Sequence, residues 1–266
     1  MVLSQDFQSI INETNDVTRL HYINFNTNNP GIYLNHCNNT YKLWKSQWQN
    51  TFSELGVEKK LFSDDFLNRQ VCGVFSNEEP IGFILYNILD LKLSSAVDSF
   101  YFHNYTEDLV NYQILKKDKA LVISYMTLNP KWRKQNTNYS ISELLISFVV
   151  LELNFSDAQR VIGYFRNNRS TNEIFYRHAG KFLQKQSAYN VDVDFAEIHL
   201  GESHLSTQKD HAVLACKMWT SFKNEKTINP YKENTYGFKN SDQQRKNELI
   251  SQFFSKPRLE QQEFLF

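Results

Sequence analysis

The residues best suited to chemistry form a strand, a basic loop and a helix in the middle of the chain. Residues 121–128 are an extended, partly β-branched segment, and a proline follows two positions later. Lys131, Arg133 and Lys134 come next, and the apolar run 141–153 predicts a helix. A helix N-terminus presents open backbone N–H groups, which together with positive charge can bind a phosphate. The sequence therefore predicts a phosphate site where the loop meets this helix.

A second stretch follows that helix. Residues 160–165 have the composition of a strand and lead into Asn167 and Asn168. Tyr176 comes later, four positions before Gly180. Together the two stretches resemble the GNAT acyltransferase superfamily, whose core reads strand, V-x-P-x-x-R-G-x-G-x-G, helix, strand, then N…LY-x-x-x-GF.

The resemblance implies that the chain binds acetyl-CoA or another acyl-CoA as an acyl donor. Arg133 holds the arginine position of the loop, and the glycine positions fall on Asn136 and Asn138. A shifted alignment that begins at Gln135 uses Asn138 and Ser140 instead, and both alignments stay open. Residues 140–143 also have the spacing of a capping box, which would bring a carboxylate to the phosphate site. The implied cofactor-binding residues are Met126, Thr127, Leu128, Arg133, Lys134, Gln135, Asn136, Asn138, Ser140 and Asn168.

Two residues carry catalytic roles by resemblance. The backbone N–H of Leu128 would bind the thioester oxygen as it becomes an oxyanion, with Met126 and Thr127 beside the pantetheine arm. Tyr176 would protonate the departing thiolate, although a helical tyrosine beside Phe175 can also serve packing alone. The candidates for a general base are Glu79, Asp90, His103, another residue of the segment 92–119 and a water chain.

The order of elements before the phosphate loop matches the same superfamily. The expected elements are a strand at 18–26, a helix at 40–55 ended by Gly56, a short helix at 62–67 with Ser63 as N-cap, and a hairpin of 71–75 and 81–89. We predict an α/β (α+β) fold of the GNAT type, with a mixed, mostly antiparallel central sheet flanked by helices. A helical insertion follows the third strand, and a C-terminal extension follows the sheet.

We expect residues 1–200 to form the acyltransferase domain. Its insertion, about 92–119, is rich in aromatic residues and either lies near the acceptor side of the cleft or simply covers the sheet. Segments 182–189 and 191–200 predict a closing antiparallel pair. Residues 201–266 form a helical extension packed on the domain, with helices expected at 212–222 and 241–254.

Composition limits the classes of protein that fit. The 266 residues contain 41% hydrophobic residues, enough for a full core, and 29 basic and 29 acidic residues. This balance disfavours nucleic acid as a partner. The sequence shows neither a membrane span nor a signal peptide, and three scattered cysteines form no disulfide framework or zinc motif. We therefore expect a cytoplasmic protein without a bound metal or a membrane partner.

These features favour an acyl-CoA-dependent N-acyltransferase that transfers an acetyl or other acyl group directly to an amine. The glycine-poor loop also fits a GNAT-fold protein that has lost catalysis and serves as a binding or assembly module. Transfer from acyl-carrier protein or aminoacyl-tRNA is a further alternative. The acceptor stays undefined, and a homodimer stays open.

Overall fold

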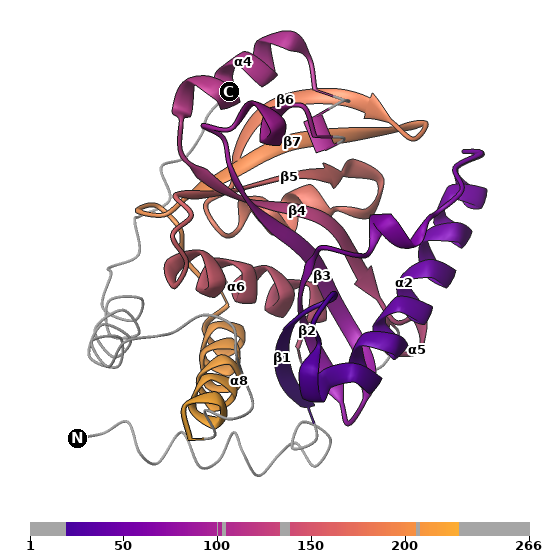
Figure 1. Cartoon of the computed structure of the whole chain (residues 1–266), viewed down its shortest axis with the longest axis vertical. Helices are drawn as coiled ribbons and strands as arrows, with labels where there is room; N and C mark the ends of the chain where they lie inside the picture. The colour runs from indigo at the N-terminus through magenta and orange to yellow at the C-terminus, as the bar shows by residue number, and fades with distance from the viewer. Residues whose placement is uncertain (1–19, 100, 103–104, 134–138, 206–207, 229–266) are drawn as a thin grey trace.

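The computed structural model describes residues 20–99, 101–102, 105–133, 139–205 and 208–228. Its strands form one seven-stranded sheet in the order β1-β2-β3-β4-β5-β7-β6 (Figure 1). Only β4 and β5 run parallel to each other, and every other neighbouring pair is antiparallel. The strands are β1 Leu20–Asn26, β2 Gln70–Ser76, β3 Glu79–Asp90, β4 Lys119–Leu128, β5 Arg160–Arg166, β6 Lys181–Ala188 and β7 Val191–His199. The predicted mixed, mostly antiparallel sheet is confirmed.

The helices fall close to the positions that apolar periodicity predicts. They are α2 Leu34–Glu54, α3 Ser94–Val97, α4 Glu107–Lys116, α5 Pro130–Arg133, α6 Ile141–Asn154, α7 Thr171–Tyr176 and α8 Lys209–Ile228. Gly56 has φ of +63°, a left-handed conformation that favours glycine and suits the end of α2. The expected short helix at 62–67 is only a 3₁₀ turn, η3 Ser63–Asp65, and Phe62 rather than Ser63 precedes it as the cap.

The helices cover both faces of the sheet. A Cβ on Gly82 of β3 would lie 2.9 Å from the Ile141 side chain, so this side of the sheet faces α6. Phe83, the next residue, pairs with Thr127, whose hydroxyl accepts a hydrogen bond from Trp48 of α2. Because successive side chains of a strand point to opposite faces, α2 and α6 lie on opposite sides. We call these the α2 face and the α6 face.

The α6 face has an additional outer layer. Nearly every residue of α6 is buried, because α8 packs over the helix from the other side (Figure 1). Glu152 of α6 accepts hydrogen bonds from Trp219 of α8 at 2.8 Å and from Tyr22 of β1 at 2.7 Å. The C-terminal extension therefore docks on the sheet domain through α8. The second helix expected there, at 241–254, lies outside the described residues.

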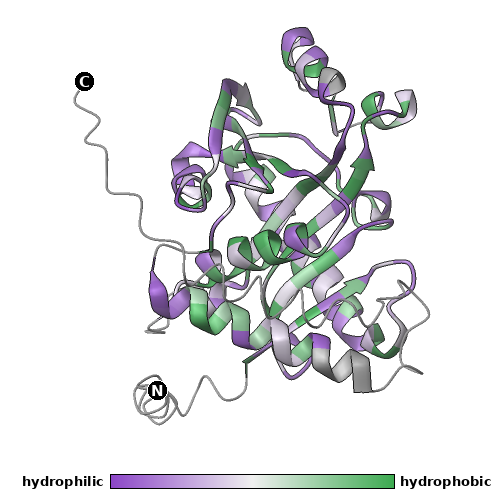
Figure 2. Ribbon diagram, turned by 90° about the vertical axis from the view of Figure 1, so that its left-hand side faces the viewer, coloured by the Kyte–Doolittle hydropathy of each residue, from purple (hydrophilic) through white to green (hydrophobic). Residues whose placement is uncertain are grey.

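The insertion after β3 is helical, as predicted, and lies on the α2 face. Residues of α4 and of the segments before and after α3 pack over β4, β5 and β7 in a separate cluster that includes Phe102, Tyr105, Leu109, Val122 and Phe195. Figure 2 shows apolar residues gathered along the strands and the helices that cover them. None of the helices in the described part of the chain combines the length and apolarity needed to cross a bilayer.

Candidate functional site

The parallel pair β4 and β5 separates along its length. Hydrogen-bonded pairing joins Ala120–Val122 to Arg160–Ile162 and stops there (Figure 1). Ser124 is an extra residue in β4, because Ile123 pairs with Tyr86 while Tyr125 pairs with Leu85. Such a bulge bends its strand and increases the local twist. We call the resulting gap, between residues 124–128 of β4 and 163–166 of β5, the notch.

The backbone of β4 presents polar groups to the notch. Asn129 N–H donates to the Ile81 carbonyl oxygen at 2.8 Å, toward β3. In an antiparallel ladder the next residue points its N–H and C=O the other way, so those of Leu128 face the notch. The same alternation places the backbone groups of Met126 there. Two of the expected cofactor-binding residues thus lie in a geometry that suits an extended pantetheine arm.

Thr127 lies between them, but its side chain is engaged elsewhere. Its hydroxyl accepts the Trp48 Nε1–H at 3.0 Å, and the side chain is buried on the α2 face. The Thr127 side chain is therefore held on the α2 face, and its expected place beside a cofactor stays a prediction.

The basic segment after β4 begins as a helical turn rather than a loop. The Asn129 side chain accepts the Lys131 N–H at 3.1 Å and donates to the Pro80 carbonyl at 3.1 Å, which ties α5 to the β2–β3 turn. Arg133 is the last residue of α5. Lys134, Gln135, Asn136 and Asn138 lie outside the described residues, so their expected phosphate contacts stay predictions.

The start of α6 differs from a capping box. The Ser140 hydroxyl accepts the Glu143 N–H at 3.4 Å, as an N-cap does, while the Ser140 N–H donates to His211 Nε2 of α8 at 2.6 Å. The Glu143 carboxylate turns away and accepts Arg177 Nε–H at 2.6 Å. The second half of the expected capping box is therefore absent, because Glu143 pairs with Arg177 and the Ser140 N–H is taken by His211. The amides of Ile141 and Ser142 are those that a helix N-terminus leaves for an anion.

Tyr176 lies at the end of the sheet where the notch opens. Its hydroxyl donates to Asp194 Oδ2 at 2.6 Å, and Asp194 also accepts Nδ2–H groups of Asn167 and Asn172, each at 2.9 Å. Asp194 pairs across the sheet with Phe165, near the end of β5. The residues that sequence reasoning missed here are Asp194 and Asn172. The available signal for Asp194 was an aspartate among apolar residues in the strand predicted at 191–200.

This cluster shifts the acidity of both partners. Burial raises the pKa of Tyr176, and the hydrogen bond to Asp194 adds to the increase. Burial alone would raise the pKa of Asp194, but hydrogen bonds from Tyr176, Asn167 and Asn172 outweigh it and hold this pKa below its ordinary value. At neutral pH the pair is therefore a phenol held by a carboxylate.

The remaining candidates are not brought together. Asn168 accepts Arg166 Nε–H at 3.2 Å at the end of β5, and only its neighbour Asn167 joins the Asp194 cluster. Asp90 pairs with Lys119 at the opposite end of β4, about 30 Å from Leu128 at 3.3 Å per residue. That distance excludes Asp90 as a general base. Glu79 binds Lys131 and Asn129 at the surface, and His103 lies outside the described residues.

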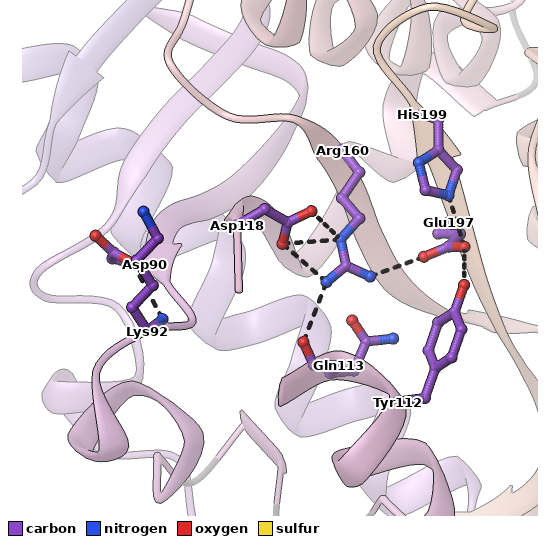
Figure 3. Close-up of polar contacts among 8 residues, drawn as sticks. All are labelled: Asp90, Lys92, Tyr112, Gln113, Asp118, Arg160, Glu197 and His199. Atoms are coloured by element: carbon purple, nitrogen blue, oxygen red, sulfur yellow. Dashed lines mark hydrogen bonds and ion pairs between the residues drawn. The ribbon is translucent and has the colours of Figure 1, made fainter. Parts of the chain in front are cut away.

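The paired end of β4 and β5 holds a second polar cluster (Figure 3). Arg160 is fully buried and donates to Glu197 at 2.9 Å, to Asp118 at 3.0 Å and to the Gln113 carbonyl oxygen at 3.4 Å. Glu197 also accepts the Tyr112 hydroxyl at 2.7 Å. Tyr112 and Gln113 belong to α4, so the cluster fastens the insertion to the sheet. Its charges are paired within the cluster, which is the pattern of a structural site.

Comparison with known proteins supports the fold. No known family profile matches the sequence, and no curated protein matches it either. Among solved structures, FeeM, an N-acyl amino acid synthase from uncultured soil microbes, aligns with a TM-score of 0.52 at 8% identity. The alignment covers 69% of this chain and 92% of FeeM.

Two further solved structures align less well with this chain. BjaI, a CoA-dependent acyl-homoserine lactone synthase, aligns with a TM-score of 0.47 at 10% identity over 75% of this chain and 90% of BjaI. NAA60 of Arabidopsis thaliana, solved with acetyl-CoA, aligns with a TM-score of 0.42 at 13% identity over 68% and 99% of the two chains. The chain has the GNAT fold, as its sequence predicts.

Proposed function

We propose that the chain is a divergent GNAT enzyme, an acyl-CoA-dependent N-acyltransferase that transfers an acyl group directly to an amine. The observation that carries the proposal is the notch, where β4 leaves β5 and turns the Leu128 and Met126 backbone groups into the gap. An extended thioester arm can bind there as an additional strand would. The cationic turn and the first amides of α6 suit its diphosphate.

The reaction follows from this arrangement. A neutral amine attacks the thioester carbon, the Leu128 N–H stabilises the oxyanion, and the carbon–sulfur bond then breaks as the amide forms. The amine loses one proton to solvent through a water chain, and the departing thiolate takes one proton from Tyr176. Solvent then returns a proton to the Tyr176 phenolate, which completes the cycle. Asp194 positions the tyrosine hydroxyl at the notch end of β7. The products are an N-acyl amine and free CoA.

A catalytically inactive binding module is the second candidate. The specific observation in its favour is that His211 occupies the Ser140 N–H at the start of α6, which removes one amide from a phosphate. The glycine-poor loop points the same way.

Native mass spectrometry of freshly purified protein, followed by calorimetric titration with acetyl-CoA and longer acyl-CoAs, separates the two. The enzyme proposal predicts a co-purified or titratable acyl-CoA and release of CoA thiol when amines are added. Absence of binding with every acyl-CoA would contradict it. Binding without thiol release toward any amine would support the inactive module.

A further inference from the structure

The C-terminal helix α8 contacts α6 near both ends of α6. Near the C-terminal end, the Glu152 carboxylate accepts the Trp219 Nε1–H at 2.8 Å and lies 3.4 Å from Lys223 Nζ. Near the N-terminal end, Nε2 of His211 accepts the Ser140 N–H at 2.6 Å. About two helical turns separate His211 from Trp219, so one helix reaches both from the sheet and from the start of α6.

The two contacts differ in how completely their polar groups are paired. Glu152 is buried and accepts from Tyr22 and Trp219, with Lys223 as its cation. His211 is 5% exposed, and only its Nε2 has a hydrogen-bond partner within the described residues. Because Nε2 accepts, the neutral ring carries its proton on Nδ1, which is then a buried donor without an acceptor. Such a donor costs free energy, so α8 is held less firmly at His211 than at Glu152.

The His211 contact lies where the proposed function places the donor diphosphate. Ser140 is the N-cap of α6, and its hydroxyl accepts the Glu143 N–H at 3.4 Å. Its own N–H would otherwise be available beside those of Ile141 and Ser142. A phosphate oxygen can bind the Ser140 N–H only after His211 Nε2 has released it.

Protonation is the change that releases this hydrogen bond. An imidazolium carries an N–H group at each nitrogen and has no lone pair, so it cannot accept the Ser140 N–H. It can instead donate to a phosphate oxygen, and so can Ser140 once its N–H is released. Binding of the diphosphate and protonation of His211 should therefore favour each other, since such coupling is reciprocal.

The groups around His211 determine when it takes up the proton. Burial lowers the pKa of His211, and the carboxylates of Glu143 on α6 and Asp210 on α8 oppose the decrease. Glu143 is paired with Arg177, and the Tyr139 ring lies against the imidazole with ring centroids 5.4 Å apart. In the free protein His211 is therefore neutral at pH 7 and above, and the contact is closed. A bound diphosphate would bring negative charge and raise the pKa of His211.

We infer that His211 is a proton-operated gate on the diphosphate site, through which the C-terminal extension controls binding of the acyl donor. The inference rests on the proposed function. With His211 neutral, the Ser140 N–H is occupied. With His211 protonated by solvent at Nε2, both residues donate to the diphosphate. The donor should therefore bind more tightly as the pH falls below 7.

Two substitutions fix the gate in opposite states. His211→Gln keeps an acceptor near the position of Nε2 and cannot titrate, so the gate should stay closed at every pH. His211→Phe keeps a ring of similar size without an acceptor, so the Ser140 N–H should stay available at every pH. His199→Gln is the control, because it replaces another histidine, which contacts Glu197 at the paired end of β4 and β5.

Calorimetric titration of the full chain with acetyl-CoA and octanoyl-CoA, between about pH 5.5 and 8, measures the gate. The wild type and His199→Gln should bind the donor about 3- to 10-fold more tightly at the lower pH. His211→Phe should bind at the higher pH as tightly as the wild type does at the lower, whereas His211→Gln should stay weak throughout. Titrations in two buffers with different heats of protonation should show proton uptake at His211, as the difference between the wild type and the two His211 variants.

The outcomes separate the gate from the proposed function. An equal pH dependence in the wild type, His211→Gln and His211→Phe, with the donor bound by all three, would overturn the gate and leave the acyltransferase standing. If binding follows the predicted pattern while no amine releases CoA thiol, the proposed function falls and the gate stands. If no variant binds either donor at any pH, both fall. Should His211→Phe fail to fold, the wild type must still gain affinity and take up a proton where His211→Gln does not.

Discussion

The two ends of the β4–β5 pair treat buried polar groups in opposite ways. Where the strands pair, Arg160, Asp118 and Glu197 bond one another and hold α4 on the sheet. Where the strands separate, the backbone groups of Leu128 and Met126 turn into the notch. Burying a charge with its partners fixes a structure, whereas backbone groups that face a gap between strands can bind an extended ligand. The contrast separates the part of the molecule that maintains the fold from the part that we expect to react.

The largest effect should come from breaking the closed end. Arg160→Met leaves Glu197, only 2% exposed, without its cation, and breaking a buried ion pair costs about 3 to 5 kcal/mol. Urea unfolding measures the change. Lys185→Gln, at an exposed pair, is the matched control and should leave the free energy of unfolding nearly unchanged. Similar losses in the two variants would show that the Arg160 cluster does not hold the fold.

The next effect tests the open end. Tyr176→Phe removes the proposed acid and should lower kcat by about 100- to 1,000-fold, while KM for acyl-CoA changes little. Because the hydroxyl is half-buried and contributes one hydrogen bond, unfolding free energy should fall by about 1 kcal/mol. A kcat within threefold of the wild-type value would show that Tyr176 is not the general acid and serves packing alone.

Asp194 should tune this tyrosine. Both burial and Asp194 raise the pKa of Tyr176 above the ordinary value of a phenol, which is about 10. The wild-type phenol therefore stays protonated up to at least pH 10, and we expect no decline of kcat from its ionisation below that pH. Asp194→Asn removes the carboxylate, lowers the pKa of Tyr176 and should move the alkaline decline of kcat to lower pH, with about a tenfold loss at neutral pH. A pH profile of kcat measures the shift. If the decline of kcat at alkaline pH is the same in Asp194→Asn and the wild type, Asp194 does not set the acidity of the catalytic group.

The smallest effect concerns Thr127, an expected cofactor residue. Thr127→Val leaves the Trp48 Nε1–H without its acceptor and should cost about 1 kcal/mol in urea unfolding. KM for acyl-CoA should remain within twofold, because only the position of Thr127 in β4 concerns the notch. A tenfold rise in KM for acyl-CoA without a loss of stability would show that the Thr127 hydroxyl contacts the cofactor.

The individual strands and helices were predictable because apolar periodicity is a local signal, and the resemblance to the GNAT superfamily implied how they are arranged. The strands and the apolar run of α6 fall within a few residues of their expected bounds. The site was less predictable, because it depends on which distant side chains meet. Nothing near Ser140 in the sequence indicates that His211 takes its N–H, or that Glu143 turns to Arg177.

Amide hydrogen exchange during titration with acetyl-CoA, or with the longer acyl-CoA that binds, tests the central distinction most directly. We predict new protection at residues 124–128, 163–166 and the first turn of α6, where the notch and the helix N-terminus would contact the donor. Residues 118–122, 160–162 and 197 at the closed end should exchange as before. Protection confined to the closed end, or none at the notch while the donor is bound, would contradict the account.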